Sequence, residues 1–350
     1  MLNKVIIYRK EAVIYGFGYV KDQLCYVTQD SDGFASEAVF NAKIIKINHA
    51  EHSAFIEYAS GKTGFVNLAK GAKLQDGANL LVQLTWLGDE SKQAKFRTSV
   101  QLVGKYVVTA STGIGADCSR ASVTQRETLS QAMLHYPAKW TLRSSVKQLN
   151  DIDPVMLEIE RIGMQLTKLA TLSTGDEIIS GVPNYLKLLR SLALAPECLI
   201  ISNDKLVDEQ LLDLQDCWLL DAIEYNPRLD MESELSVYRE LLASSSYNLS
   251  NGASLEIHCL SGINLIDVNS DKAKFSRSKL NFLVLDAIYQ QICLRNLQGI
   301  ILLDLLKNMT TTEQEQVIEY LKKLFKHDIT NTKVLGFSHS GLCELIRQKF

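Results

Sequence analysis

The alternation of apolar and polar residues is clearest from Gly262 to Met309, where it predicts a strand, a basic loop, a helix and a second strand. Ile263, Leu265 and Val268 are the apolar residues of the first run, and residues 299–303 form a second run that is rich in strand formers. Asp267 and Asp304 stand at or near the ends of these runs. Two strands joined by a helix usually lie parallel and adjacent, because the crossover returns the chain to the same edge. We therefore expect both carboxylates at one rim of a sheet.

Two carboxylates beside a basic loop suit a hard divalent cation that acts on phosphate, because such ions prefer oxygen ligands. Asn269 lies alongside the first aspartate. An aspartate that only caps a turn at a strand end is the alternative interpretation, and the pattern by itself leaves both open.

Residues 39–104 contain closely spaced alternating strands separated by glycine-containing turns, which predicts a small closed β-barrel of the OB type. Residues 41–105 carry nine Lys or Arg and five Asp or Glu, a local charge of +4 in a chain with a net charge of −3. Phe65 follows a glycine in a turn-rich segment, so we expect it to be an exposed platform for stacking a base. Phe55 and Trp86 are expected to fill the barrel core.

Residues 105–178 are predicted to contain a strand, a polar helix and a long one-faced helix from about Pro154 to Leu172. Arg143 and Ser144 lie together in a loop of this segment and could hold a phosphate, since Arg binds its oxygens bidentately. Helix capping and a surface salt bridge are the alternative. Near the C-terminus, the pattern predicts an amphipathic helix, a strand and then a helix over residues 341–350.

The composition describes a globular protein of two or three domains, with 350 residues, 46% hydrophobic and 22% charged. The start of the chain does not have the pattern of a signal peptide, and no stretch approaches the roughly 20 apolar residues of a membrane span. Seven scattered cysteines without a C-x-x-C pair favour reduced thiols in the cytoplasm. The overall charge shows no nucleic-acid signature, so any RNA-binding surface must be local.

Several segments resemble the ribonuclease E/G family, and they occur in the same order as in that family. The run GINLIDVNS, the helix ending in QQICLRNLQG, the run GIILLD and the ending GLCELIRQKF resemble the family's catalytic region. AFIEYASGKTGFVNL resembles its RNA-binding barrel, and the sequence from Ser119-Arg120 to Arg143-Ser144 resembles its 5′-monophosphate sensor.

The resemblance implies an α+β multidomain fold, in which an RNase H-like domain is interrupted by an OB-type RNA-binding barrel and a 5′-sensor region, and a deoxyribonuclease-I-like catalytic subdomain follows. The implied bounds are 1–38 and 179–250 for the RNase H-like parts, 39–104 for the barrel, 105–178 for the sensor and 251–350 for the catalytic subdomain.

The resemblance also implies a metal-dependent endoribonuclease that cleaves single-stranded RNA to 5′-phosphate and 3′-hydroxyl ends, in rRNA processing or mRNA turnover. Asp267 and Asp304 would bind Mg²⁺, and Asn269 would hold Asp267 by a hydrogen bond. Arg143 and Ser144 would hold the 5′-phosphate of the RNA. The residues implied to contact RNA elsewhere are Phe65, Lys95, Arg97 and Lys105.

This chain departs from the family pattern at Lys307, where family members usually carry an acidic residue three positions after the second aspartate. The loop after Asn269 is shorter than in the family, and no Cys-Pro-x-Cys zinc link occurs, so a zinc-linked dimer is not expected. These departures favour an alternative, a catalytically weakened member that acts as an RNA-binding protein. A barrel-containing translation or ribosome-assembly factor is a third interpretation, but it leaves the paired aspartates unexplained.

Overall fold

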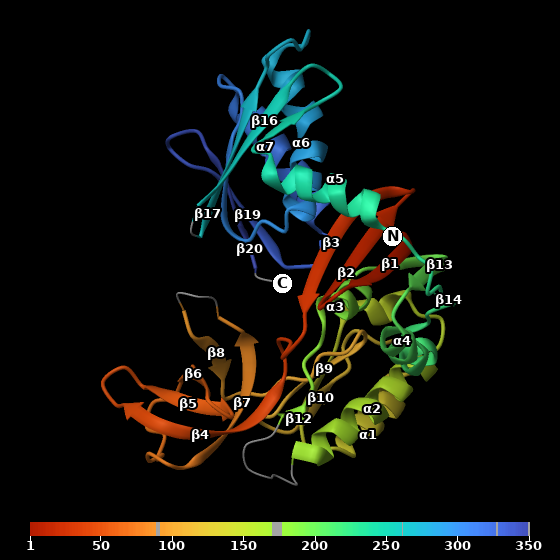
Figure 1. Ribbon diagram of the computed structural model, residues 1–350, viewed down its shortest axis with the longest axis vertical. Helices are drawn as coiled ribbons and strands as arrows, with labels where there is room; N and C mark the ends of the chain where they lie inside the picture. The colour runs from red at the N-terminus through yellow and green to blue at the C-terminus, as the bar shows by residue number, and fades with distance from the viewer. Residues whose placement is uncertain (89–91, 170–176, 261, 327, 349–350) are drawn as a thin grey trace. The chain divides into compact units, whose positions relative to one another are not determined.

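The computed structural model describes residues 1–88, 92–169, 177–260, 262–326 and 328–348 (Figure 1). The chain divides into two compact units. The first unit comprises residues 1–29, 191–208 and 221–350, and the second comprises residues 30–190 and 209–220. The chain therefore leaves the first unit after its N-terminal strands and returns to it near residue 191.

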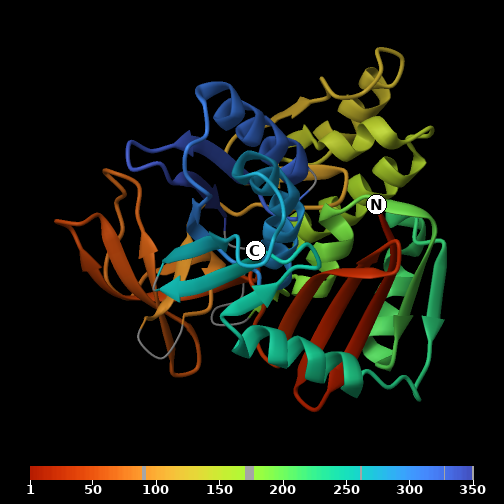
Figure 2. The same ribbon diagram turned by 90° about the horizontal axis from the view of Figure 1, so that it is seen from above.

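The N-terminal strands of the first unit form a sheet with strands from the middle of the chain. Their order is β14 (Ala222–Tyr225), β13 (Leu194–Ser202), β1 (Leu2–Lys10), β2 (Val13–Val20) and β3 (Gln23–Ser31). β13 runs parallel to both β1 and β14, and α4 (Lys205–Trp218) connects β13 to β14. In Figure 2, α5 (Glu232–Ala243) is the teal helix that lies along the red strands. Leu235 of α5 and Phe17 of β2 share one buried cluster, so this helix covers the sheet.

A second sheet in the same unit contains the two predicted aspartate-bearing strands. Its order is β15 (Ser246–Asn248), β16 (Ser254–Leu260), β17 (Ile263–Asn269), β18 (Gly299–Asp304), β20 (Cys343–Arg347) and β19 (Thr332–Phe337). The helices α6 (Arg277–Leu294) and α7 (Thr311–Phe325) supply Leu285, Ile288 and Val317 to a core that also contains Ile266 and Leu303 of the strands. Ser276 caps α6, and Thr310 with Glu313 forms a capping box at the start of α7. One face of the sheet is thus covered by helices.

The end of the chain forms a strand, and the predicted helix over residues 341–350 is wrong. β20 pairs antiparallel with both β18 and β19. Cys343 and Leu345 point into the core while Glu344 between them is less buried, which is the period of a strand covered on one face. The segment forms a strand because β18 and β19 both offer backbone hydrogen-bonding groups that it satisfies. Residues 349 and 350 lie outside the described residues.

The second unit contains the closed barrel that the sequence predicts. Its strands are β4 (Val39–Asn48), β5 (Ser53–Ala59), β6 (Lys62–Asn67), β8 (Ala94–Arg97) and β7 (Asn79–Trp86), in that order around the barrel. Pairing of β4 with β7 closes it. Phe40, Ile56, Val66, Leu84 and Phe96 fill the interior. β12 (Glu177–Ile179) pairs with β4 beside the barrel.

The rest of the second unit is a small α/β region with its own core. Its elements are β9 (Val107–Ala110), β10 (Gly115–Asp117), α1 (Arg126–Leu134), β11 (Lys139–Leu142), the 3₁₀ helix η1 (Ser144–Gln148), α2 (Asp153–Leu169) and α3 (Asn184–Ser191). Trp140, Leu129 and Ile159 belong to one buried cluster. The long helix occurs where it is predicted, and its expected continuation over residues 170–172 lies outside the described residues.

Candidate active site and nucleic-acid interface

Asp267 and Asp304 lie directly opposite each other on neighbouring strands. β17 and β18 are parallel, and their register pairs Asp267 with Asp304. Neighbouring strands are about 4.8 Å apart, and residues paired in register point to the same face. Ile266 and Leu303, one position earlier on each strand, are buried under the helices, so the two carboxylates point to the other face. The predicted parallel pairing is confirmed.

Asn269 makes the hydrogen bond that was expected of it. Its Nδ2 donates to Oδ2 of Asp267 at 3.2 Å, on the same face two residues further along β17. Because this bond uses one carboxylate oxygen, it fixes the rotamer of Asp267 and leaves the other oxygen available for a ligand.

The buried side chain of Asn281 holds the backbone of the loop that carries Lys307. Nδ2 of Asn281, on α6, donates to the Leu306 carbonyl at 2.8 Å, and the Leu306 N–H donates back to Oδ1 at 2.9 Å. The backbone next to Lys307 is therefore fixed, and this exposed cation stands three residues after Asp304 in the sequence.

The carboxylate pair has the donor set of a magnesium site. Among the described residues, no group of three or more His, Cys, Asp or Glu side chains is arranged to hold a metal ion. Mg²⁺ is commonly held by one or two carboxylates, with waters and substrate phosphate completing its octahedral shell. Asp267 and Asp304 are both partly exposed, so water and phosphate can reach them. Two carboxylates of this kind fit Mg²⁺ that is shared with a substrate.

Sequence reasoning missed a third carboxylate on this face. Glu256 of β16 pairs in register with Asp267 across the antiparallel β16–β17 ladder, so Glu256, Asp267 and Asp304 form one row across three strands. The strand alternation in SLEIHCL could have identified it, because Leu255 and Ile257 point into the core on either side of Glu256.

The basic loop after Asn269 lies at the same edge. Its backbone is fixed at Lys272, whose N–H donates to the Gly252 carbonyl at 3.0 Å. The side chains of Lys272, Lys274, Arg277 and Lys279 are exposed. Two carboxylates with several exposed cations along the chain beside them suit a polyanion that approaches a bound metal ion.

The outer surface of the barrel carries aromatic side chains, and here two predictions were wrong. Phe55 is 41% exposed and pairs in register with the half-buried Phe65, with ring centroids 5.9 Å apart. Trp86 is also half-buried and lies outside the barrel core. The register of β7 shifts between Leu84 and Trp86, and this bulge turns Trp86 from the inner to the outer face. Phe55 and Trp86 therefore do not fill the core.

Of the basic residues implied to contact RNA, Lys95 is exposed, whereas Arg97 is occupied inside the protein. Nη2 and Nε of Arg97 donate to Oε1 of Gln83 at 2.6 and 3.0 Å, and Nη1 donates to Oε1 of Gln101 at 2.9 Å. Burial lowers the pKa of Arg97 from its ordinary value. These contacts hold β7, β8 and the following segment together, so the structure does not place Arg97 among the exposed cations.

Lys105 is likewise buried, with 9% exposure, and its Nζ donates to the carbonyl of Trp218 at 2.8 Å. The backbone N–H of Lys105 donates to Oε1 of Glu158 at 2.6 Å, and the Trp218 indole donates to the same oxygen at 2.8 Å. Burial raises the pKa of Glu158, and hydrogen bonds from neighbouring backbone N–H groups oppose that rise. Lys105 thus belongs to an internal polar network that is separate from the barrel surface.

Arg143 and Ser144 lie together at the start of η1. Arg143 is half-buried and donates to the Gly104 carbonyl through Nη1, whereas Ser144 is exposed. Burial lowers the pKa of Arg143, and the neighbouring Arg190 lowers it further. Arg190 donates to both carboxylate oxygens of Glu37 at 2.9 and 2.7 Å, so the repulsion between the two guanidinium groups is offset by a carboxylate of the protein itself.

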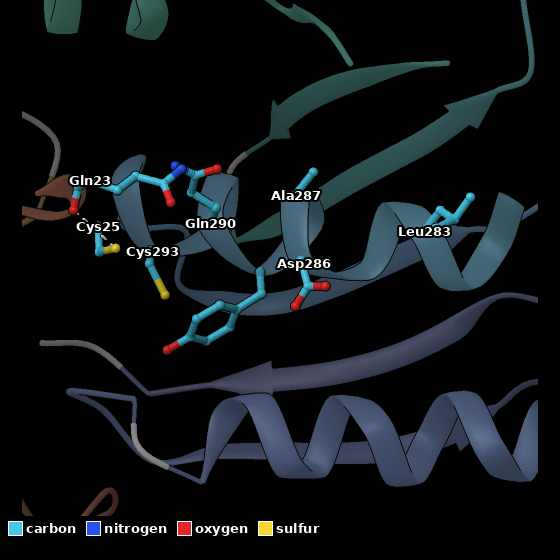
Figure 3. A pocket seen from close by; sticks show the side chains of 8 residues that line it. Gln23, Cys25, Leu283, Asp286, Ala287, Gln290 and Cys293 are labelled. Atoms are coloured by element: carbon cyan, nitrogen blue, oxygen red, sulfur yellow. Dashed lines mark hydrogen bonds between the residues drawn. The ribbon is translucent and has the colours of Figure 1, made fainter. Parts of the chain in front are cut away.

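The pocket drawn in Figure 3 is separate from these residues. It has a volume of about 320 Å³ and lies between β3 and α6. Cys25, Cys293 and Asp286 are among the residues that line it. Burial raises the pKa of both thiols, so neither has the character of a reactive thiolate. The pocket contains none of the predicted site residues.

Comparison with known proteins agrees with the resemblance seen in the sequence. Residues 220–350 match the model of the Ribonuclease E/G family. The chain is 20% identical over 357 residues to Ribonuclease E of Buchnera aphidicola subsp. Acyrthosiphon pisum (strain APS), covering 89% of this chain and 39% of that protein. It is 22% identical over 298 residues to Ribonuclease G of Salmonella typhimurium (strain SL1344), covering 79% of this chain and 60% of that protein. The chain thus spans less than two thirds of either relative, and the predicted family resemblance is confirmed.

None of the described helices is long and apolar enough to cross a membrane.

Proposed function

We propose, on the premise that residues 220–350 are a Ribonuclease E/G family segment, that this chain is an Mg²⁺-dependent endoribonuclease that cleaves single-stranded RNA. The observation that carries the proposal is the register pairing of Asp267 with Asp304, together with the hydrogen bond from Asn269. The relatives matched by the chain are named ribonucleases, which supports RNA as the substrate.

Each residue of the site has a distinct task in this proposal. Asp267 and Asp304 would hold Mg²⁺, and the bound ion would supply charge stabilisation for the scissile phosphate and an acidified water. Asn269 orients Asp267. The exposed cations of the loop after Asn269 attract the RNA backbone and neutralise its phosphates. The products would carry 5′-phosphate and 3′-hydroxyl ends.

The second unit supplies RNA binding in this proposal. The closed barrel is interpreted as an OB-type module, in which Phe65, Phe55 and Lys95 contact single-stranded RNA. Arg143 and Ser144 are interpreted as a 5′-phosphate sensor, in which the exposed Ser144 and the N–H groups of Arg143 other than the one that donates to the Gly104 carbonyl would contact the phosphate.

Removal of the metal tests the reaction directly. A fluorescently labelled, 5′-monophosphorylated, A/U-rich RNA is expected to be cut in Mg²⁺ and to stay intact when EDTA replaces it, because two carboxylates alone cannot neutralise a phosphodiester transition state. Gel electrophoresis gives the rate, and ligation gives the end chemistry. Cleavage that persists in EDTA would contradict the proposal, and equal cutting of 5′-triphosphate RNA would contradict the sensor role.

Lys307 favours a second candidate, a family member that binds RNA but cuts it weakly. An exposed cation three residues after Asp304 reduces the negative potential that attracts Mg²⁺. Lys307→Glu is expected to lower the Mg²⁺ concentration for half-maximal cleavage about fivefold, the order expected when two unit charges change near a solvated divalent ion. Lys323→Glu on the exposed side of α7 makes the same charge change elsewhere and serves as control.

The outcome separates the two candidates. Cleavage by the wild type that Lys307→Glu improves at low Mg²⁺ supports an enzyme limited by its metal affinity. If both proteins bind RNA equally well and neither cuts it at any Mg²⁺ concentration, the RNA-binding candidate holds.

A further inference from the structure

One row of side chains crosses the outer surface of the barrel from β4 to β7. The register pairs Lys46 with Phe55, Phe55 with Phe65, Phe65 with Lys95, and Lys95 with Trp86. Both ends of the row depend on irregular pairing, because the register shifts just before Lys46 on β4 and just before Trp86 on β7. Each bulge turns onto the outer face a side chain that strict alternation would point inward.

The composition of this row is that of a surface for single-stranded nucleic acid. Lys46 and Phe55 are exposed, Phe65 and Trp86 are half-buried, and Lys95 is exposed. Aromatic faces stack on bases of any kind, and lysines between them neutralise the phosphates. Apolar rings exposed to water in a row are unfavourable in free energy, and a ligand that covers them removes this cost.

Trp86 and Lys95 form a distinct pair at one end of the row. Nζ of Lys95 lies 5.8 Å from the centroid of the Trp86 ring. The ammonium lies over the face of the indole, so a base that stacks on that face would displace Nζ, and the displaced cation would still be within reach of the phosphate of that nucleotide. On the other side of Lys95, β6 carries Phe65, whose ring contacts that of Phe55.

The length of the row fits several nucleotides. Three strand-to-strand steps separate Phe55 from Trp86, which is about 14 Å at about 4.8 Å a step. A stacked strand rises about 3.4 Å per nucleotide, so roughly four nucleotides match this span. That is the lower end of the site size of about 4–16 nucleotides known for OB folds.

We propose that Trp86 and Lys95 form a further nucleotide subsite on the barrel, so that single-stranded RNA lies across the strands on Phe55, Phe65 and Trp86 in turn. The proposal rests on the proposed RNA-binding function of the barrel and extends it by one aromatic platform, Trp86, which Lys95 contacts. It does not depend on catalysis by Asp267 and Asp304.

Intrinsic fluorescence tests the subsite, because the other two of the three tryptophans are buried. Trp140 is 0% exposed and Trp218 is 5% exposed, so quenching by a stacked base reports on Trp86. The full chain in EDTA is titrated with fluorescein-labelled oligo(A) of eight nucleotides, and anisotropy measures binding; unlabelled oligo(A) is used for the tryptophan signal. The wild type is expected to lose tryptophan emission in proportion to the RNA bound.

Variants separate stacking from folding. Trp86→Leu is expected to weaken binding about tenfold and to abolish the quenching, whereas Trp86→Phe keeps most of the affinity without the quenching. Lys95→Gln is expected to reduce the salt dependence of binding by about one phosphate contact. Ile45→Ala changes an exposed apolar residue of β4 outside the row and should bind like the wild type.

The subsite is contradicted if the wild type binds RNA without a change in tryptophan emission and Trp86→Leu binds with wild-type affinity. The proposed RNA-binding role of the barrel would then still stand. No binding of oligo(A) by the wild type would overturn both the subsite and the proposed role of the barrel. Quenching that is absent in both Trp86 variants, with loss of affinity only in Trp86→Leu, confirms the proposal.

Discussion

Replacing Asp304 by asparagine is expected to reduce Mg²⁺-dependent RNA cleavage by about 10³-fold, and Asp267→Asn is expected to do the same. Each change removes one of the two negative charges that the register brings together. An amide keeps the shape of the carboxyl group but gives a divalent ion only a neutral oxygen, so several kcal/mol of transition-state stabilisation are lost. Single-turnover cleavage of a labelled RNA at saturating Mg²⁺ measures the loss.

A matched control is available on α6. Asp286 is exposed on that helix and accepts a hydrogen bond from the Tyr320 hydroxyl, which an asparagine oxygen can accept equally well. Asp286→Asn should therefore cleave at the wild-type rate. RNA binding in EDTA should be unchanged in all three variants. If Asp304→Asn and Asp286→Asn cut equally fast, the carboxylate pair is not the catalytic centre.

Replacing Arg347 by methionine is expected to lower the free energy of unfolding by about 3–5 kcal/mol. Arg347 and Asp328 have side chains that are 0% exposed, and Nε and Nη2 of Arg347 donate to the two oxygens of Asp328 at 2.7 and 3.0 Å. Burial by itself lowers the pKa of Arg347, but the hydrogen bonds and charge of Asp328 outweigh it and raise the pKa. Without its partner, the carboxylate of Asp328 would be left as a buried charge.

Urea unfolding followed by circular dichroism measures this effect. Arg161→Met is the control, because the pair of Arg161 with Asp213 has side chains that are 39% and 64% exposed and should contribute at most about 1 kcal/mol. The double variant Arg347→Met with Asp328→Leu should regain part of the loss, since no charge is then buried alone. A loss in Arg347→Met no larger than that in Arg161→Met would show that the buried pair contributes little.

The aspartate pair shows how far a one-dimensional pattern can go. The two apolar runs, the helix between them and the aspartates at their ends are local features, and the crossover rule makes two such strands parallel neighbours. The register that pairs Asp267 with Asp304 agrees with that expectation. The hydrogen bond from Asn269 follows from the same alternation, because residues two apart on a strand share a face.

Trp86 shows where the pattern fails. Its position in the alternation of β7 indicates an inward side chain, but a single extra residue between Leu84 and Trp86 moves it outside. A bulge depends on how two strands meet, and the sequence of one strand does not contain that information. Arg97 and Lys105 fail for a related reason, since their acceptors Gln83 and Trp218 are distant in sequence.

The sequence by itself determined most of the elements, the closed barrel, the carboxylate-bearing strands and the resemblance to the Ribonuclease E/G family, because all of these follow from short-range periodicity and local motifs. Only the tertiary structure decided which side chains face solvent at the bulges, which cations are already engaged, and that the end of the chain is a strand beside β18. These outcomes depend on backbone pairing and burial between distant segments, which set the cost of leaving a polar group unpaired.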